Sequence, residues 1–202
     1  MPVSALIRAA RNGDVSTVRE LLGQCGRTDE DGWSALMFAA MGNHIECVRA
    51  LVPNEIGMRD SCGQTALHLA AAKGCAEVLP FLISGEAGKQ DNIGLTALME
   101  ATIHGYENCA RLLLCEAGHQ TTEGYRQKGK YNVAGQTALM FAVQCGHPNL
   151  VKLLLPFEQG LTDERGHTAR WYADQSGDPK IRQILCEEAC NRLVPPPIPQ
   201  TI

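Results

Sequence analysis

A four-residue pattern, Gly-x-Ser/Thr-Ala, recurs along the chain and constrains the fold more than any other feature. Its copies are 31, 31, 41 and 31 residues apart and begin at Gly32, Gly63, Gly94, Gly135 and Gly166. A truncated copy opens the chain at Ser4-Ala5-Leu6. One short helical hairpin cannot bury its apolar face alone, so a fixed period of this size predicts hairpins stacked in a solenoid. The interval of 41 residues indicates one period that carries an insertion.

Each copy predicts two helices. The Ser or Thr is suited to cap the first helix, which runs for about eight residues. A residue that tolerates the left-handed conformation then ends it, at Gly13, Asn43, Gly74, Gly105, Gly146 and Gly177. Apolar residues at helical spacing follow, and we expect them to form the shared core: Val18, Leu21, Leu22, Val48, Leu51, Val52, Val78, Leu82, Leu112, Leu113, Val151, Leu154, Leu155, Ile181, Ile184 and Leu185.

One copy, Thr65-Ala66-Leu67-His68-Leu69-Ala70-Ala71, resembles the ankyrin signature Thr-Pro-Leu-His-x-Ala-Ala, with Ala in place of Pro. Other copies have Met where the signature has His, and the period is about two residues shorter than usual. These features are similar to ankyrin arrays abundant in parasitic protists. An Asp-x-x-Gly lead-in precedes four copies, at Asp29, Asp60, Asp91 and Asp163. The resemblance implies an all-α solenoid of stacked helix-turn-helix units with short turn or hairpin fingers.

The repeat boundaries predict one array over residues 1–193, followed by a Pro-rich tail over 194–202. The units are 1–28 as an N-terminal cap, 29–59, 60–90, 91–131 with an insertion near 117–134, 132–162, and 163–193 as a C-terminal cap. Bulky and polar residues in the last copy suit a cap, and we expect Trp171 to cover the last core layer. The tail is expected to be extended, since Pro lacks an N–H donor, and a docking motif there is the alternative. The opening Met and the tail favour a complete small protein.

Composition argues against several classes of function. The net charge of −4 gives no general attraction to nucleic acid or to anionic membranes. The apolar runs are too short to cross a bilayer, and the first residues lack the charged start and long apolar core that are typical of a signal peptide. The number of cysteines, nine, is odd, which argues against a framework of disulfide pairs. We therefore expect a monomer in the reducing cytoplasm, with cytoskeletal association through a partner as an alternative.

No motif for catalysis or metal binding stands out. The sequence has no phosphate-binding Gly-Lys-Ser/Thr loop, and the cysteines lack zinc-finger spacing. His44, His68 and His147 occupy structural positions of the repeat. We therefore expect no enzymatic activity, no metal and no cofactor. Cys47 and Cys109 align with core positions, and among the cysteines only Cys62 and Cys145, near the expected groove, are predicted to be accessible.

In the ankyrin family the partner usually lies in a concave groove formed by the turn tips and the exposed side of the first helix. The resemblance maps these positions to Glu30, Asp31, Trp33, Met41, Ser61, Cys62, Gln64, Lys73, Asn92, Ile93, Leu95, Ile103, His104, Gln136, Gln144 and Cys145. The apolar members either form an exposed interface or fold down onto neighbouring turns.

The insertion holds the only locally basic and aromatic stretch of this acidic chain. It is either a finger that contacts an acidic partner or a solvated loop, and its candidates are Tyr125, Arg126, Lys128, Lys130 and Tyr131. The favoured hypothesis for the whole chain is a protein-binding adaptor or scaffold that holds its partner in the groove. Two alternatives remain: the targeting portion of a larger enzyme, such as a kinase or a ubiquitin ligase component, and a purely structural spacer.

Overall fold

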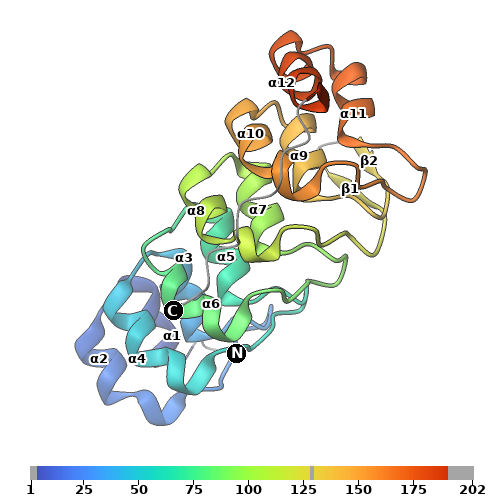
Figure 1. Cartoon of the computed structure of the whole chain (residues 1–202). Coiled ribbons are helices and arrows are strands. Elements are labelled where there is room, and N and C mark those ends of the chain that lie inside the picture. Colours follow the sequence, from blue (N-terminus) through green and yellow to red (C-terminus); the bar gives the residue numbers. More distant parts are fainter. Residues whose placement is uncertain (1–3, 128–129, 191–202) are drawn as a thin grey trace.

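In the computed structural model, which describes residues 4–127 and 130–190, the predicted all-α solenoid is confirmed. Six helix pairs stack from the N-terminal end to the C-terminal end (Figure 1). The pairs are α1 (Ala5–Asn12) and α2 (Val15–Glu20), α3 (Ala35–Met41) and α4 (Ile45–Glu55), α5 (Ala66–Lys73) and α6 (Leu79–Glu86), α7 (Ala97–His104) and α8 (Glu107–Leu112), α9 (Ala138–Gln144) and α10 (Pro148–Glu158), and α11 (Ala169–Ser176) and α12 (Pro179–Cys190). Short 3-10 helices cover Leu22–Gln24 and Leu114–Glu116.

The first helix of each pair begins and ends where the sequence predicts. Ser34, Thr96, Thr137 and Thr168 accept a backbone N–H from the first turn, as capping residues do. The six predicted terminators all have positive φ values, including 55° at Asn43, the only described residue other than Gly in that region. The left-handed turn therefore explains why Gly or Asn recurs at this position.

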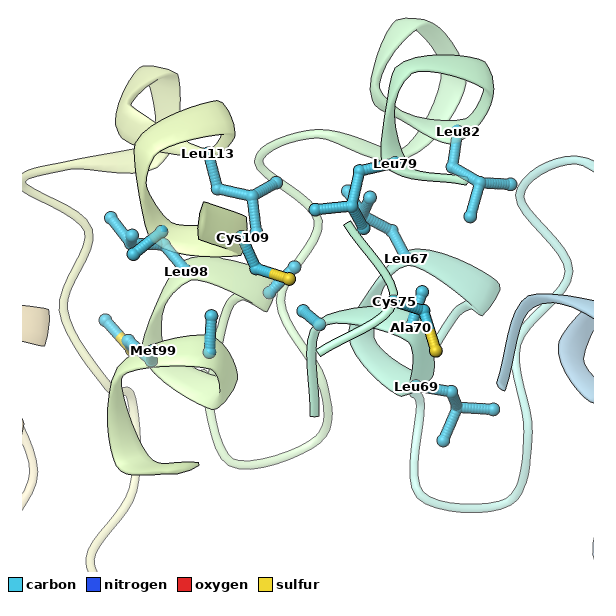
Figure 2. Close-up of a cluster of buried hydrophobic side chains, with 14 of the residues drawn as sticks. Leu67, Leu69, Ala70, Cys75, Leu79, Leu82, Leu98, Met99, Cys109 and Leu113 are labelled. Atoms are coloured by element: carbon cyan, nitrogen blue, oxygen red, sulfur yellow. The ribbon is translucent and has the colours of Figure 1, made fainter. Parts of the chain in front are cut away.

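Most of the predicted core is buried. Leu67 on α5 and Leu98 on α7 are fully covered, and Figure 2 shows them beneath the second helices with Leu82 and Leu113. Cys47 and Cys109 are buried, as predicted. Leu112, however, was wrongly placed in the core, because its side chain is 42% exposed. Counted from the Thr-Ala motif, Leu112 matches the half-buried Ala50, Phe81 and Leu153, whereas Leu113 takes the buried position.

Four buried glutamates, Glu55, Glu86, Glu116 and Glu158, join the second, third, fourth and fifth repeats each to the repeat before it. We call them the glutamate clamp. In each, one carboxylate oxygen accepts the N–H of a Gly in the preceding connection, and the other accepts an N–H in the first turn of its own repeat's first helix. A carboxylate suits this place, since it meets the free N–H groups at a helix N-terminus. Nothing in the sequence analysis identified this feature.

The fingers between helix pairs share one internal geometry. In four of them an Asp accepts two backbone N–H groups, two and four residues further along the chain. His68 ties one finger to the next, since Nδ1 lies 3.3 Å from the Thr65 amide nitrogen and Nε2 lies 3.0 Å from the Leu95 carbonyl oxygen. Its structural role is confirmed. His44 is structural too, with Nε2 placed 3.1 Å from the Arg11 carbonyl oxygen.

The insertion is an elongated finger. We number each finger by the repeat that it opens, so this is the fifth finger and the one at Asp163 is the sixth. Thr121 takes the place of the finger Asp, because its Oγ1 accepts the Gln136 N–H and its own N–H donates to the Gln136 carbonyl. Between them the chain forms an antiparallel pair, β1 (Tyr125–Gln127) and β2 (Lys130–Asn132). Gln120 fixes the base of this hairpin, since its Nε2 donates to the carbonyls of Gly135 and Thr162 in two successive fingers. Figure 1 shows the hairpin beside α9.

Candidate functional site

Successive first helices pack against one another, from α1 through α11, and the fingers extend along the same side of the array. Toward the C-terminal end, this side is hollowed by a cavity of about 750 Å³. Helices α7, α9 and α11 form its floor, while the base of the hairpin and the sixth finger form its walls. We call it the C-terminal pocket.

A chain of hydrogen bonds forms one side of this pocket. Gln136 Nε2 donates to the Tyr172 hydroxyl at 2.9 Å, and that hydroxyl donates to Asp163 Oδ2 at 2.6 Å. Burial alone would raise the pKa of Asp163, but hydrogen bonds from Tyr172 and two backbone N–H groups outweigh it and lower the pKa. Burial and the bond to Asp163 raise the pKa of Tyr172. The hydroxyl therefore keeps its proton and Asp163 is ionised.

Two stacked aromatic rings adjoin this chain of hydrogen bonds. The Trp171 ring lies parallel to the His167 ring, with an angle of 8° and a centroid separation of 3.7 Å. Tyr172 meets the Trp171 ring edge-on at 5.1 Å. Trp171 is 40% exposed, so the prediction that it covers the last core layer is wrong. Ala169 and Ala173 form the buried face of α11 instead.

One carboxyl interrupts the apolar lining of the groove side. At the position of Phe38, Leu69 and Phe141 in other repeats, α7 has Glu100, which is 7% exposed. Gln64 Nε2 donates to its Oε1 at 3.3 Å, and His104 Nδ1 lies 3.7 Å from its Oε2. Burial, with a smaller contribution from the charge of Asp91, raises the pKa of Glu100 to about 7. Its charge therefore changes near neutral pH.

The structure divides the predicted groove residues into three groups. Eight are exposed, namely Glu30, Asp31, Ser61, Cys62, Lys73, Asn92, His104 and Cys145. Five are half-buried, namely Trp33, Met41, Gln64, Ile93 and Gln144. Leu95, Ile103 and Gln136 are buried, with 4%, 4% and 1% of their surfaces exposed. Leu95 and Ile103 thus fold down onto their neighbours, and the apolar surface expected of them is small.

The array does not bring all of these residues to one place. Five of them, Ile103, His104, Gln136, Gln144 and Cys145, line the C-terminal pocket, whereas those of the second and third repeats lie outside it. Trp33 packs on the Phe38 ring at 5.1 Å, and the Arg11 guanidinium covers the Phe38 ring. The N-terminal part of the groove is therefore partly filled by its own side chains.

Some predicted features fall outside what can be described. Lys128 lies outside the described residues, and only the backbone is described at Tyr125, Arg126, Lys130 and Tyr131.

Cys62 and Cys145 are exposed, as predicted, but Cys186 is exposed as well, so the prediction that only those two are accessible was wrong. In the part of the chain that the structure describes, no group of three or more His, Cys, Asp or Glu side chains is placed to hold a metal ion. Within the same residues, no helix has the length and apolar character to span a membrane.

Sequence reasoning missed three residues of the pocket wall, Arg165, His167 and Trp171. The signal for two of them was present. The positional rule that selects Trp33 and Gln136, the residue after the finger Gly, also selects His167, and the residues between Asp and Gly include Arg165. The last copy was instead interpreted only as a cap.

Comparisons with known proteins agree with this architecture. A family model described as "Ankyrin repeats (3 copies)" matches residues 6–92, 53–123 and 120–193. The crystal structure of EF0377, an ankyrin repeat protein, is 28% identical, with a TM-score of 0.74 over 93% of this chain and 98% of that chain. A search of curated proteins found no significant match.

Two more distant structures share the fold. A chain from the complex of the Bdellovibrio bacteriovorus predatory endopeptidase Bd0816 with immunity protein Bd3460 is 23% identical, with a TM-score of 0.71 over 93% of this chain and 100% of that chain. The ankyrin repeat domain of Bcl-3, a member of the IkappaB family, is 21% identical, with a TM-score of 0.79 over 92% of this chain and 86% of that chain.

Proposed function

Because the chain belongs to the ankyrin repeat family, we propose that it binds a partner protein along the side formed by its first helices and fingers, as a non-catalytic adaptor or scaffold. Ankyrin repeats are protein-protein interaction domains, and no catalytic family is indicated for this chain. The likeness to a chain of the complex between an endopeptidase and an immunity protein supports an assembly of this kind.

The C-terminal pocket is the observation that carries this proposal. A cavity of about 750 Å³ on the finger side, with an exposed aromatic ring in its wall, is a surface that a partner can fill. Concave sites with apolar walls and a few fixed polar groups are where proteins usually bind ligands, and Trp is enriched at the energetic centres of interfaces. The stacked repeats are held by the glutamate clamp, so little order would have to be gained on binding.

The setting that we propose is the reducing interior of a cell, where the chain acts as a monomer. The eight cysteines within the described residues are all free thiols. The acidic net charge of −4 favours a protein partner over nucleic acid or an anionic membrane.

Affinity capture with matched surface variants tests the proposal. The groove variant would combine Asp31→Lys, Trp33→Ser, Lys73→Glu and Trp171→Ser. Leu95 and Ile103 are left unchanged, because they are buried and their substitution would destabilise the core. The control would combine Arg111→Glu, Leu112→Ser and Lys152→Glu, which are exposed or partly exposed on the outer helices. Far-UV circular dichroism would first confirm that both variants are folded.

We expect the wild-type chain and the outer-helix control to retain the same protein from a lysate of the source cell, and the groove variant to lose it. Retention of the same proteins by all three chains, or of none by any, would contradict the proposed function. The second result is what a purely structural spacer would give.

A further inference from the structure

The elongated fifth finger makes the C-terminal pocket different from the rest of the array. The finger contributes Asn132 and Val133, from the end of β2 and the segment after it, to the lining of the pocket. In the other fingers only two residues separate the Asp from the Gly, so they offer no comparable wall. The pocket is therefore a product of the insertion and of the unusual last repeat together.

The interior of the pocket suits a bulky apolar side chain. Trp171, which is 40% exposed, and Tyr172 supply ring faces and edges, while Ile103 and Val133 add only the 4% and 8% of their surfaces that are exposed. A volume of about 750 Å³ lies within the range of roughly 300–1,000 Å³ that is typical of ligand sites. It has room for one large side chain together with the backbone on either side of it.

Gln136 adds a hydrogen-bonding requirement to this wall. Its Nε2 is held by the Tyr172 hydroxyl, while its Oε1, buried and lining the same pocket, accepts no hydrogen bond from the described residues. A buried acceptor without a donor is unfavourable, because it has lost its hydrogen bonds to water. A backbone N–H of an occupant, or a water that the occupant retains, would complete its hydrogen bonding after a small shift of the side chain.

The charges around the pocket favour an acidic occupant. The titratable side chains of basic type that line it are His104, His147, Arg165 and His167, and among the described lining residues none is Asp or Glu. Glu100 and Asp163 lie behind the lining and are 7% and 4% exposed, which leaves Arg165 as the exposed charge at the mouth. Between Gly124 and Phe157 the sequence has four Lys or Arg and no Asp or Glu, although the whole chain is acidic.

We propose that the C-terminal pocket binds an extended acidic segment of the partner protein, with one large apolar or aromatic side chain packed against the exposed ring of Trp171. In that arrangement a carboxylate beside that side chain pairs with Arg165. This inference rests on the proposed function and names the chemistry of the partner. The Pro-rich segment 194–202 of this chain is apolar but has no acidic residue, so it fits the pocket less well.

Fluorescence anisotropy with labelled peptides of about nine residues tests this inference on the full chain. One peptide would have Phe at the centre with Glu on both sides, a second the same Phe with Lys on both sides, and a third a central Ser with Glu on both sides. A fourth would be segment 194–202. The pocket variants would be Trp171→Ala and Arg165→Glu. The control for Trp171→Ala is Leu112→Ala, because the two side chains are similarly exposed, and the control for Arg165→Glu is Arg111→Glu on outer helix α8.

We expect the acidic Phe peptide to bind at least about tenfold more tightly than the other three, a difference of about 1.4 kcal/mol. Trp171→Ala and Arg165→Glu should each weaken it by at least about fivefold, while the controls leave it unchanged. Similar affinities for all peptides, or equal losses in variants and controls, would overturn the proposal. Tighter binding of segment 194–202 would instead assign the pocket to the chain's own tail.

The two experiments fail independently. Loss of the captured protein by the groove variant, together with no preference for the acidic Phe peptide, would leave the protein-binding function in place and refute only the chemistry proposed for the pocket. A preference for that peptide without capture of any protein would support the pocket and contradict the proposed function.

Discussion

Replacing Glu116 by Gln gives the sharpest test of how the repeats are held together. Glu116 is 1% exposed, its Oε1 accepts the Gly88 N–H at 2.9 Å, and its Oε2 accepts the Leu98 N–H at 2.7 Å. Gln has almost the same shape, so the change creates no cavity. Its amide offers only one oxygen, however, and its NH₂ group must face one of the two N–H donors.

The expected loss follows from these contacts. One buried N–H left without an acceptor costs about 1–3 kcal/mol. Loss of a negative charge beside the first turn of α7 adds about 0.3–1 kcal/mol. Burial raises the pKa of Glu116, with the two N–H groups opposing that shift, so removal of the charge recovers part of its desolvation cost. We therefore expect the free energy of unfolding to fall by about 1–3 kcal/mol at neutral pH.

Urea unfolding followed by far-UV circular dichroism measures this change, with exposed Glu20→Gln on α2 as the control for a charge lost elsewhere. Hydrogen exchange should also become faster at the amides of Gly88 and Leu98 and remain unchanged at distant amides. A Glu116→Gln chain as stable as the wild type, or more stable, would refute the reasoning. The desolvation cost of the carboxylate would then equal or exceed what its two hydrogen bonds contribute.

Two further predictions concern the core and the buried carboxyl of the groove. Leu98→Ala should lower the free energy of unfolding by about 2–5 kcal/mol, whereas exposed Leu112→Ala should change it by less than about 1 kcal/mol. Thermal or urea unfolding measures both changes, and the opposite ranking would contradict the assignment of the core. For Glu100, whose pKa is raised to about 7, the stability that its proton provides is complete below the unfolded value of 4.5 and is lost as the pH rises through about 7. At pH 8 the free energy of unfolding of Glu100→Gln, measured with urea, should therefore exceed that of the wild type by up to about 3 kcal/mol. This difference should shrink towards pH 5, and parallel pH profiles of the two chains would contradict the prediction.

The features that the sequence predicts best depend on local backbone geometry. A Gly or Asn is required wherever the chain turns left-handed after the first helix, and all six such positions follow from the period alone. Helix caps are likewise set by neighbouring residues. Contacts between repeats depend on residues far apart in the sequence and are harder to predict. His68 is an exception, because the ankyrin signature marks it as structural and its side chain lies against the Leu95 carbonyl of the next finger.

Leu112 shows where a pattern of apolar residues misleads. The clamp residues Glu55 and Glu86 are 31 positions apart, but Glu86 and Glu116 are only 30 apart. The fourth repeat therefore reaches its clamp with one residue fewer, and a 3-10 helix over Leu114–Glu116 covers the length because it rises further per residue. The missing residue lies after Leu113, so it does not move Leu112. The pair Leu112-Leu113 corresponds to Leu153-Leu154 rather than to Leu154-Leu155, and Leu112 therefore takes the outward position.

Only part of the pocket follows from the repeat: repeat positions select residues such as Ile103 and Gln136, but not Asn132, Val133 and Trp171, which depart from the repeat. Thr121 replaces the Asp that opens the other fingers, so the start of the fifth finger does not show the lead-in motif even though its backbone bonds are the same. Trp171 stands where the signature position is Met or His, and it turns outward because no following repeat covers it. A repeat pattern identifies what the units share, which is the pair of helices and its core. Specific binding depends on what a single unit does differently, so the departures from the period are the positions to examine first when a partner is sought.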